Sequence, residues 1–290
     1  HTFEIEEGPF DKIVPGYYYR TDNYGKFTNG SGCGNEVASE RPMVRKFIKD
    51  SVRYWSEEYG VDGYRFDLMG LIDIDTMEQI TTELHNEIDS TLLIYGEPWT
   101  AGGSPLAAEL QTLKGSQKDK NFAVFNDNLR NAVRSASGNG NGKDPGFATG
   151  ATGQEDRVVQ GIKGAIDDFT NAPTESINYV AAHDNLNIWD KVMADMNKAL
   201  KPETTTNPHA IITESNPLEN EAVRRSLLSN GIVFTSQGIP FIHAGDEMLR
   251  SKYGDHNSYK SSDEINKIRW ELKTEYEKVF DYYQGLIELR

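Results

Sequence analysis

Hydrophobic and polar positions along this chain follow two different periods. Between Arg41 and Tyr59 the apolar residues return at steps of three and four, which predicts a helix with one apolar face. Ser39 is the predicted N-cap of this helix, and Gly60 ends it. Residues 61–67 then read as a strand. The first helix is therefore followed directly by a strand.

The same order of helix and strand repeats immediately. Asp75 and Glu78 have the spacing of a capping box, which predicts the start of a second helix. The run "TLLIYGEP" follows it and is continuously apolar, as in strands buried on both faces of a parallel sheet. Asp67 and Glu97, at the ends of the two strands, lie 30 residues apart, the length of one βαβ repeat.

Three more apolar runs predict further strands: "FAVFND", "INYVAAHD" and "IPFIHAGDE". Helices are predicted near 124–134, 220–230 and 275–290, and the glycine-rich stretch 137–153 is a predicted loop, as is most of 1–40. No repeat or linker divides the chain, so one α/β domain is the simplest interpretation.

A polar residue able to do chemistry stands at the end of every predicted strand: Asp67, Glu97, Asp127, Asp184 and Asp246. In a (β/α)8 barrel the active site lies at the carboxyl ends of the strands. Doubly wound sheets share this habit but usually carry a glycine-rich phosphate loop, and the sequence has none. The pattern therefore favours a (β/α)8 TIM barrel.

Charge and composition exclude several classes of protein. The net charge is −15, and no basic patch suggests a nucleic-acid partner. Cys33 is the single cysteine, which excludes an internal disulfide framework and a cysteine-based zinc site. The apolar runs are shorter than the ~20 residues of a membrane span, so none is predicted.

Arg65 and Asp67 are the first candidates for chemistry. Strand side chains alternate, so the two lie on one face, where the guanidinium favours the ionised carboxylate. Such a carboxylate suits a nucleophile, although a purely structural ion pair explains this stretch equally well. Glu97 has Trp99 two residues away, and a glutamate walled by aromatic rings suits a general acid.

Two carboxylates flanking a bond are the working groups of glycoside hydrolysis. Asp184, which follows His183 at a later strand end, is a third candidate that could stabilise a distorted sugar. A His-Asp pair alone is weak evidence, because most such pairs are surface polar sequence.

In combination these motifs resemble the α-amylase superfamily of glycoside hydrolases. The stretches "GYRFDLMG", "YGEPWT", "HDNLNIWDK" and "GIPFIHAGDEMLRSKYGDHNSYKSSDEIN" are similar to type I pullulanases, which debranch α-1,6-glucans. The resemblance implies that Asp67 is the nucleophile, Glu97 the acid/base and Asp184 the transition-state stabiliser. It also implies substrate binding by a further set: His1, Arg65, Trp99, His183, Asp255, Asn257 and Asp263.

The resemblance also implies the limits of this stretch of barrel. His1 matches the last residue of the family's first motif, so residues 1–290 are expected to be the catalytic barrel from the end of strand three to the start of helix eight, truncated at both ends. Open sheet edges are poorly tolerated, so the missing N-terminal barrel segment of the same protein is an expected partner. An α-glucan substrate, a bacterial extracellular or cell-surface location and no required cofactor are further expectations, with a structural calcium ion left open.

Two alternatives remain open. One is a relative of different linkage specificity, either acting on α-1,4 bonds or debranching in the manner of isoamylase. The other is a carbohydrate-binding fragment without catalysis, against which the joint presence of Arg65, Asp67, Glu97 and Asp184 speaks.

Overall fold

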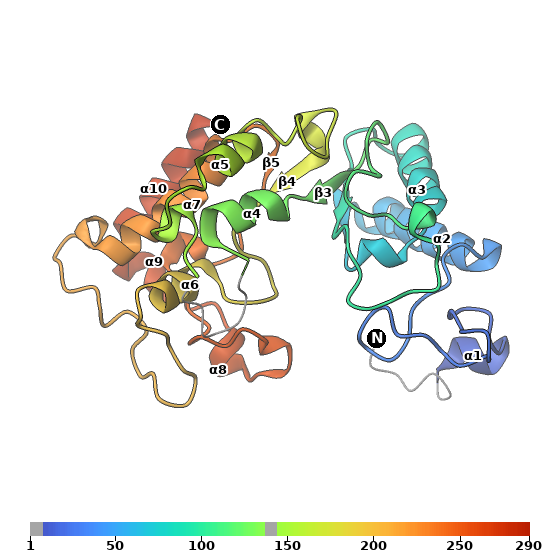
Figure 1. Cartoon of the computed structure of the whole chain (residues 1–290), viewed down its shortest axis with the longest axis horizontal. Helices are drawn as coiled ribbons and strands as arrows, with labels where there is room; N and C mark the ends of the chain where they lie inside the picture. Colours follow the sequence, from blue (N-terminus) through green and yellow to red (C-terminus); the bar gives the residue numbers. More distant parts are fainter. Residues whose placement is uncertain (1–7, 137–143) are drawn as a thin grey trace. The chain divides into compact units, whose positions relative to one another are not determined.

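The computed structural model describes residues 8–136 and 144–290, in two compact units (Figure 1). Unit 1 comprises residues 8–125 and Phe169–Glu175, and unit 2 comprises Asn126–Asp168 and Ser176–Arg290. His1 and part of the glycine-rich stretch lie outside the described residues. A single catalytic domain over 1–290 therefore stays a prediction. No helix among the described residues is long and apolar enough to cross a membrane.

Unit 1 alternates helices and short parallel strands. Its elements are α1 (Pro9–Ile13), α2 (Pro42–Tyr59), β1 (Gly63–Phe66), α3 (Ile74–Glu87), β2 (Leu93–Gly96) and β3 (Ala123–Phe125). β1 pairs in parallel with β2, and β2 pairs in parallel with β3. The predicted helix–strand–helix–strand order is confirmed. The exception is α1, which lies in the stretch expected to be loop.

The pairing of β1 with β2 depends on a glycine. Arg65 is level with Tyr95 in the parallel register, and Gly63 is level with Leu93. A Cβ atom on Gly63 would lie 2.2 Å from the main-chain oxygen of Leu93, a distance that real Cβ atoms do not adopt. Among the described residues β1 has β2 as its one strand partner, so its other edge is open, as the sequence predicts.

Gly60 ends α2 as predicted, but both predicted N-caps of unit 1 are wrong. Arg41 is the N-cap of α2, while the buried hydroxyl of Ser39 accepts the main-chain N–H of Asp73 at 2.8 Å. Asp73, rather than Asp75, caps α3, and its carboxylate accepts the N–H of Thr76 at 3.0 Å. Aspartate is among the best N-cap residues, and Asp73 is the aspartate that directly precedes the first residue of α3.

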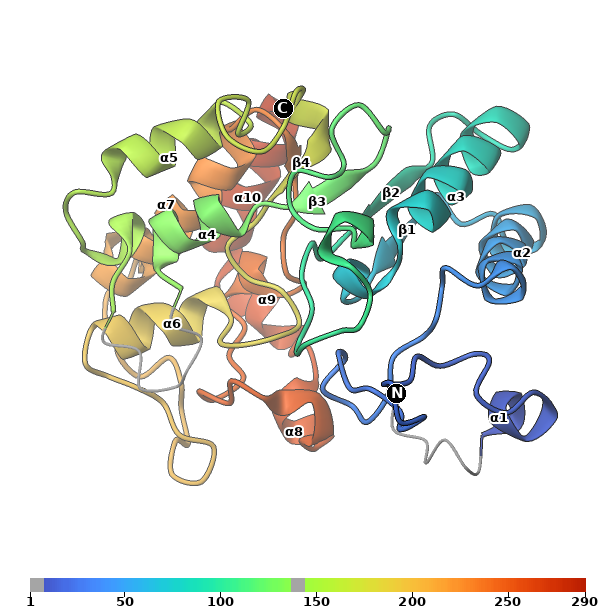
Figure 2. The ribbon, with the colours of Figure 1, turned by 45° about the vertical axis from the view of Figure 1, so that its right-hand side comes forward.

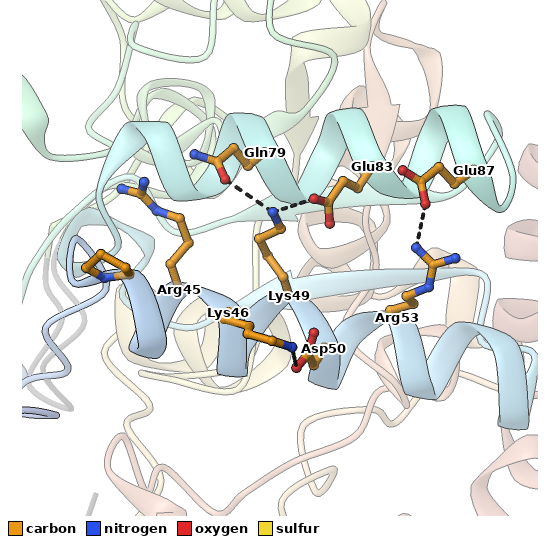
Figure 3. Close-up of a pocket in the computed structure, with 9 residues that line it drawn as sticks. Arg45, Lys46, Lys49, Asp50, Arg53, Gln79, Glu83 and Glu87 are labelled. Atoms are coloured by element: carbon orange, nitrogen blue, oxygen red, sulfur yellow. Dashed lines mark hydrogen bonds and ion pairs between the residues drawn. The ribbon is translucent and has the colours of Figure 1, made fainter. Parts of the chain in front are cut away.

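Ion pairs join α2 and α3 along their exposed sides (Figure 3). Lys49 reaches from α2 to Glu83 and donates to Gln79 at 3.2 Å, and one turn further on Arg53 pairs with Glu87 at 2.5 Å. These side chains are partly to largely exposed, so the pairs add little to stability. They link two helices that Figure 2 shows side by side.

Unit 2 is mainly helical around one large core. Its elements are α4 (Asp127–Arg134), α5 (Glu155–Ile162), β4 (Ser176–Asn178), α6 (Ile188–Asp195), α7 (Glu221–Thr235), β5 (Ile239–Pro240), α8 (Asp263–Asn266), α9 (Glu271–Glu275) and α10 (Glu277–Leu289). β4 and β5 pair in parallel. The fully buried Trp189 and Tyr283 are the largest side chains of the core.

Three of the five predicted strand-end acids do not stand at an open strand end. Asp184 lies on a turn well beyond the end of β4 (Ser176–Asn178), and the other two are Asp127 and Asp246. Asp127 begins α4, which Asn126 caps by accepting the N–H of Leu129 at 2.9 Å. Asp246 is 1% exposed and accepts from the amide of Asn230 at 3.3 Å, so no substrate can reach it. Burial raises its pKa to about 7, against the smaller opposing effect of the Asn230 hydrogen bond.

Candidate active site

Arg65 binds two carboxylates at the carboxyl ends of neighbouring strands. One nitrogen of its guanidinium pairs with Oδ1 of Asp67, just after β1, and another pairs with Oε1 of Glu97, just after β2. The parallel register places Arg65 beside Tyr95, two residues before Glu97, which brings the three groups together. The sequence predicted the first of these ion pairs. The second, to Glu97, becomes visible only in the structure.

The two carboxylates differ in how firmly they are held. The Glu97 side chain is 7% exposed, and its Oε2 accepts the main-chain N–H of Leu68 at 2.8 Å. The Asp67 side chain is 46% exposed. An oxygen of one carboxylate lies within 4.8 Å of an oxygen of the other. One acid is therefore fixed by the sheet, and the other projects toward solvent beside it.

The surroundings of Glu97 are more polar than the sequence suggested. Its carboxylate pairs with the guanidinium of Arg65 and accepts the main-chain N–H of Leu68. Trp99 takes part through its main chain. The N–H of Gly70 donates to the main-chain oxygens of both Glu97 and Trp99, each at 3.2 Å. The ring of Phe125 lies beside Arg65, with its centre 5.8 Å from the guanidinium carbon.

The third predicted acid lies in unit 2, on the turn between β4 and α6. Nε2 of His183 is 3.6 Å from Oδ1 of Asp184, and both side chains are more than half exposed. Asn185 follows with φ of 63°, in the left-handed region that asparagine tolerates better than most residues. This conformation turns the chain sharply just after Asp184, so the carboxylate is displayed at the tip of the turn.

The predicted outer substrate residues also lie in unit 2. Asp255 accepts the hydroxyl of Ser261 at 2.5 Å and the N–H of Asn257 at 2.9 Å. Burial works to raise the pKa of Asp255, but these hydrogen bonds together lower it. Asn257 and Asp263 are exposed, and Asp263 stands in the first turn of α8. Their contact with a sugar stays a prediction.

Sequence reasoning missed the residues that support the turn of Asp184. Lys252 and Asp190 are each 1% exposed. Lys252 donates to the main-chain oxygen of Asn185 at 2.7 Å, and Asp190 accepts the main-chain N–H of Lys252 at 2.8 Å. Asn187 caps α6 through the N–H of Asp190 at 3.0 Å. The one signal in the sequence was their position inside two motif stretches, "HDNLNIWDK" and "LRSKYGDHN".

Metal binding stays a prediction. Ca²⁺ takes about six to eight oxygen ligands, usually from several carboxylates and carbonyls together. The two carboxylates that unit 1 brings together already bind the guanidinium of Arg65. No residue is therefore assigned to the structural calcium ion.

The alternation of parallel strands and helices, with polar groups near the carboxyl ends of the strands, is typical of a (β/α)8 barrel. Residues 33–282 match the α-amylase catalytic domain family. The chain belongs to this family, and its fold class is confirmed as that of the family's (β/α)8 barrel.

Within the family the chain is similar to pullulanases. It is 40% identical to "Pullulanase" of Bacillus subtilis (strain 168) over 301 aligned positions, which cover 100% of this chain and 38% of the relative. The structure of "Pullulanase from Bacillus acidopullulyticus" matches with a TM-score of 0.88 and 46% identity, covering 100% of this chain and 33% of that one. A pullulanase of Anoxybacillus sp. LM18-11, "complexed with maltotriose", matches with a TM-score of 0.86 and 41% identity, covering 98% and 38%.

Proposed function

We propose that this protein is a retaining glycoside hydrolase that cleaves α-1,6-glucosidic bonds in pullulan and branched α-glucans. The observation that carries the proposal is the group of Arg65, Asp67 and Glu97, which two adjacent strands bring together. The chain spans 38% of the Bacillus subtilis relative, so activity, substrate and partners are proposed for the whole protein.

The distance between the two acids supports retention of configuration. In retaining glycosidases the carboxyl groups stand about 5–5.5 Å apart, and in inverting ones about 6.5–9.5 Å apart, to leave room for a water molecule. Oxygens of Asp67 and Glu97 come within 4.8 Å. Asp67 then attacks the anomeric carbon and forms the glycosyl-enzyme bond, while the departing sugar oxygen takes a proton from Glu97.

The second half of the reaction restores both groups. Water gives a proton to Glu97 and its oxygen to the anomeric carbon, which releases Asp67. Arg65 orients the Asp67 carboxylate through their ion pair. Arg65 also pairs with Oε1 of Glu97, so this proposal requires that contact to open and Glu97 to take up a proton from solvent before the glycosidic bond is cleaved. Asp184, with His183, is proposed to stabilise the positively charged sugar of the transition state.

The proposed substrate rests on the pullulanase relatives, one of which was solved with maltotriose. Asp255, Asn257, Asp263, Trp99 and His1 are proposed as further sugar contacts. A second segment of the same protein is proposed to pair with the open edge of β1. A bacterial extracellular or cell-surface location is proposed on the resemblance alone.

The products released from pullulan test the linkage. Cleavage of α-1,6 bonds releases maltotriose, whereas an α-1,4-acting relative of the neopullulanase type releases panose. We expect maltotriose from the full-length protein, with the α-anomer appearing first by NMR. Release of panose would contradict the proposed α-1,6 specificity. A β-anomer as the first product would contradict retention of configuration. Binding of the glucan without any product would favour the non-catalytic alternative.

A further inference from the structure

The buried ammonium group of Lys252 donates hydrogen bonds to the main chain of the turn that carries Asp184. Nζ of Lys252 donates to the main-chain oxygen of Asn185 at 2.7 Å and lies 3.4 Å from that of His183. These two carbonyl groups stand on either side of Asp184 in the sequence. One cation therefore holds the main chain both before and after the acid.

Lys252 is itself fixed by a buried carboxylate. Oδ2 of Asp190 accepts the main-chain N–H groups of Lys252 at 2.8 Å and Gly254 at 3.0 Å, and Oδ1 accepts the hydroxyl of Ser251 at 2.6 Å. Asp190 stands in the first turn of α6, just after the turn that displays Asp184. Three bonds from one carboxylate thus join the segment 251–254 to the helix that follows the Asp184 turn.

Two more contacts hold the same turn. The side-chain amide of Asn187 donates to the main-chain oxygen of Arg250 at 2.6 Å, and the guanidinium of Arg134 donates to that of Leu186 at 2.6 Å. Gly254, with φ of +81°, could not carry a side chain, since a Cβ atom there would lie 2.1 Å from the oxygen of Leu200. The segment below the turn is therefore closely packed.

Burying the charged end of this lysine is costly. Burial lowers the pKa of Lys252, against the opposing charge of Asp190, and burial raises the pKa of Asp190 despite its three hydrogen bonds. A buried ammonium group is costly unless it is hydrogen-bonded, and the bonds from Nζ of Lys252 go to the carbonyl groups of His183 and Asn185. The contacts of this lysine therefore point to the turn.

We propose that Lys252 is a positioning residue for Asp184: its ammonium group holds the carbonyl groups of His183 and Asn185 and so fixes where the Asp184 carboxylate stands. Asp190 acts one step further away by holding the main chain of Lys252. This inference rests on the proposed function, because it assumes that Asp184 acts on the sugar in the transition state.

The test replaces Lys252 in the full-length protein and measures kcat and KM on pullulan. Lys252→Met keeps the apolar stem and removes the donors, so the turn can shift, and a misplacement of about 1 Å can cost about 100-fold in rate. We expect kcat to fall about 100-fold with KM changed by less than about 3-fold, because the transition state is affected more than substrate binding. Hydrogen exchange at residues 183–187 should rise in the same variant.

Lys252→Arg keeps the charge and several donors, and we expect it to recover most of kcat. Lys191→Met is the matched control. Lys191 is equally buried in unit 2, and its ammonium pairs with Asp195 and donates to the main-chain oxygen of Asp144 at 3.0 Å. The Lys191→Met substitution should lower Tm and leave kcat close to that of the natural protein.

Three outcomes would overturn the proposal. They are unchanged kcat in Lys252→Met, equal losses in the Met and Arg variants, and a Lys191→Met variant that loses kcat in proportion to its Tm. If Lys252→Met does not fold, the Arg variant decides: recovered kcat with low exchange at 183–187 supports positioning, and lost kcat contradicts it. Failure of the proposed function is a separate result, namely full activity in Asp67→Asn.

Discussion

The two units present their candidate catalytic acids in different ways. In unit 1, Asp67 and Glu97 stand at strand ends and share one guanidinium, so side chain holds side chain. In unit 2, Asp184 stands on a turn, and a buried cation holds the main chain on either side of it. A strand end fixes an acid through the sheet ladder, whereas a turn needs support from another segment.

The difference has a consequence for charge. Arg65 contacts the acids themselves and so alters their electrostatics as well as their position. Lys252 contacts neutral carbonyl groups and acts mainly on geometry. Substitutions in unit 1 should therefore change the chemistry of the reaction, and substitutions beneath the Asp184 turn should change how often the acid is correctly placed.

The largest effect is expected for Asp67→Asn. The amide cannot form the covalent glycosyl intermediate, so hydrolysis of pullulan should fall by at least about 10⁴-fold, the scale on which removing a nucleophile acts. Because the Asp67 side chain is nearly half exposed, Tm should change little. Rates from reducing-sugar assays and Tm by calorimetry check both parts. Retained activity in this variant would remove Asp67 from the nucleophile role.

Glu97→Gln comes next in size. General acid catalysis typically contributes about 10²–10⁴-fold, so cleavage of α-glucans should fall by this factor. Glucosides with an activated phenolate leaving group need little protonation, and their first step should fall much less. Burst kinetics with both substrates measure the contrast. Equal losses on the two substrates would mean that Glu97 acts through position alone.

Asp246→Asn tests a buried acid of unit 2 that takes no part in the proposed reaction. The pKa of Asp246 is raised to about 7 by burial, so the folded protein holds the proton more tightly than the unfolded chain does. The stability that this proton contributes is present below about pH 4 and is lost as the pH rises through about 7. Between these values, Tm of the natural protein should fall relative to that of Asp246→Asn. Parallel curves of Tm against pH would contradict the raised pKa.

The smallest effect is expected for the ion pairs between α2 and α3 in unit 1. Lys49→Met removes its pair with Glu83, a partly exposed contact worth less than about 1 kcal/mol. The difference in urea midpoint should shrink at about 1 M salt, where the Debye length is about 3 Å. Lys46→Met is the control, since Lys46 pairs with Asp50 inside α2 alone. A large loss that salt does not change would show that Lys49 supports the fold in another way.

The sequence predicted the strands of unit 1 better than their ends. The run 61–67 was expected as strand, and pairing covers Gly63–Phe66, so the strand leaves out Val61 and Asp62 at one end and Asp67 at the other. The link from Arg65 to Glu97 needs the register of two strands, which apolar runs do not specify. The pair of Arg65 with Asp67 needs only alternation along one strand, and this is why it was found.

The elements missed in unit 2 have physical reasons. α6 is buried from Ile188 to Ala194, and this buried set includes the polar residues Asp190 and Lys191. The polar positions in its sequence therefore do not mark a solvent-exposed face. Lys252 is hidden for a related reason, since a lysine is expected at the surface and nothing local marks a buried one. Its role depends on a turn about seventy positions earlier, a relation that only folding creates.

Gly63 has a practical meaning for anyone who redesigns this protein. It carries no chemistry, yet even a methyl group there would meet the main chain of Leu93 and push β1 away from β2. Arg65 would then no longer reach Glu97. In a library that varies the whole motif, useful substitutions of Arg65 would be lost whenever they occur together with a harmful substitution of Gly63. Mutagenesis that aims at new linkage specificity should hold this glycine constant and vary the turns, where backbone and side chain can move without opening the sheet.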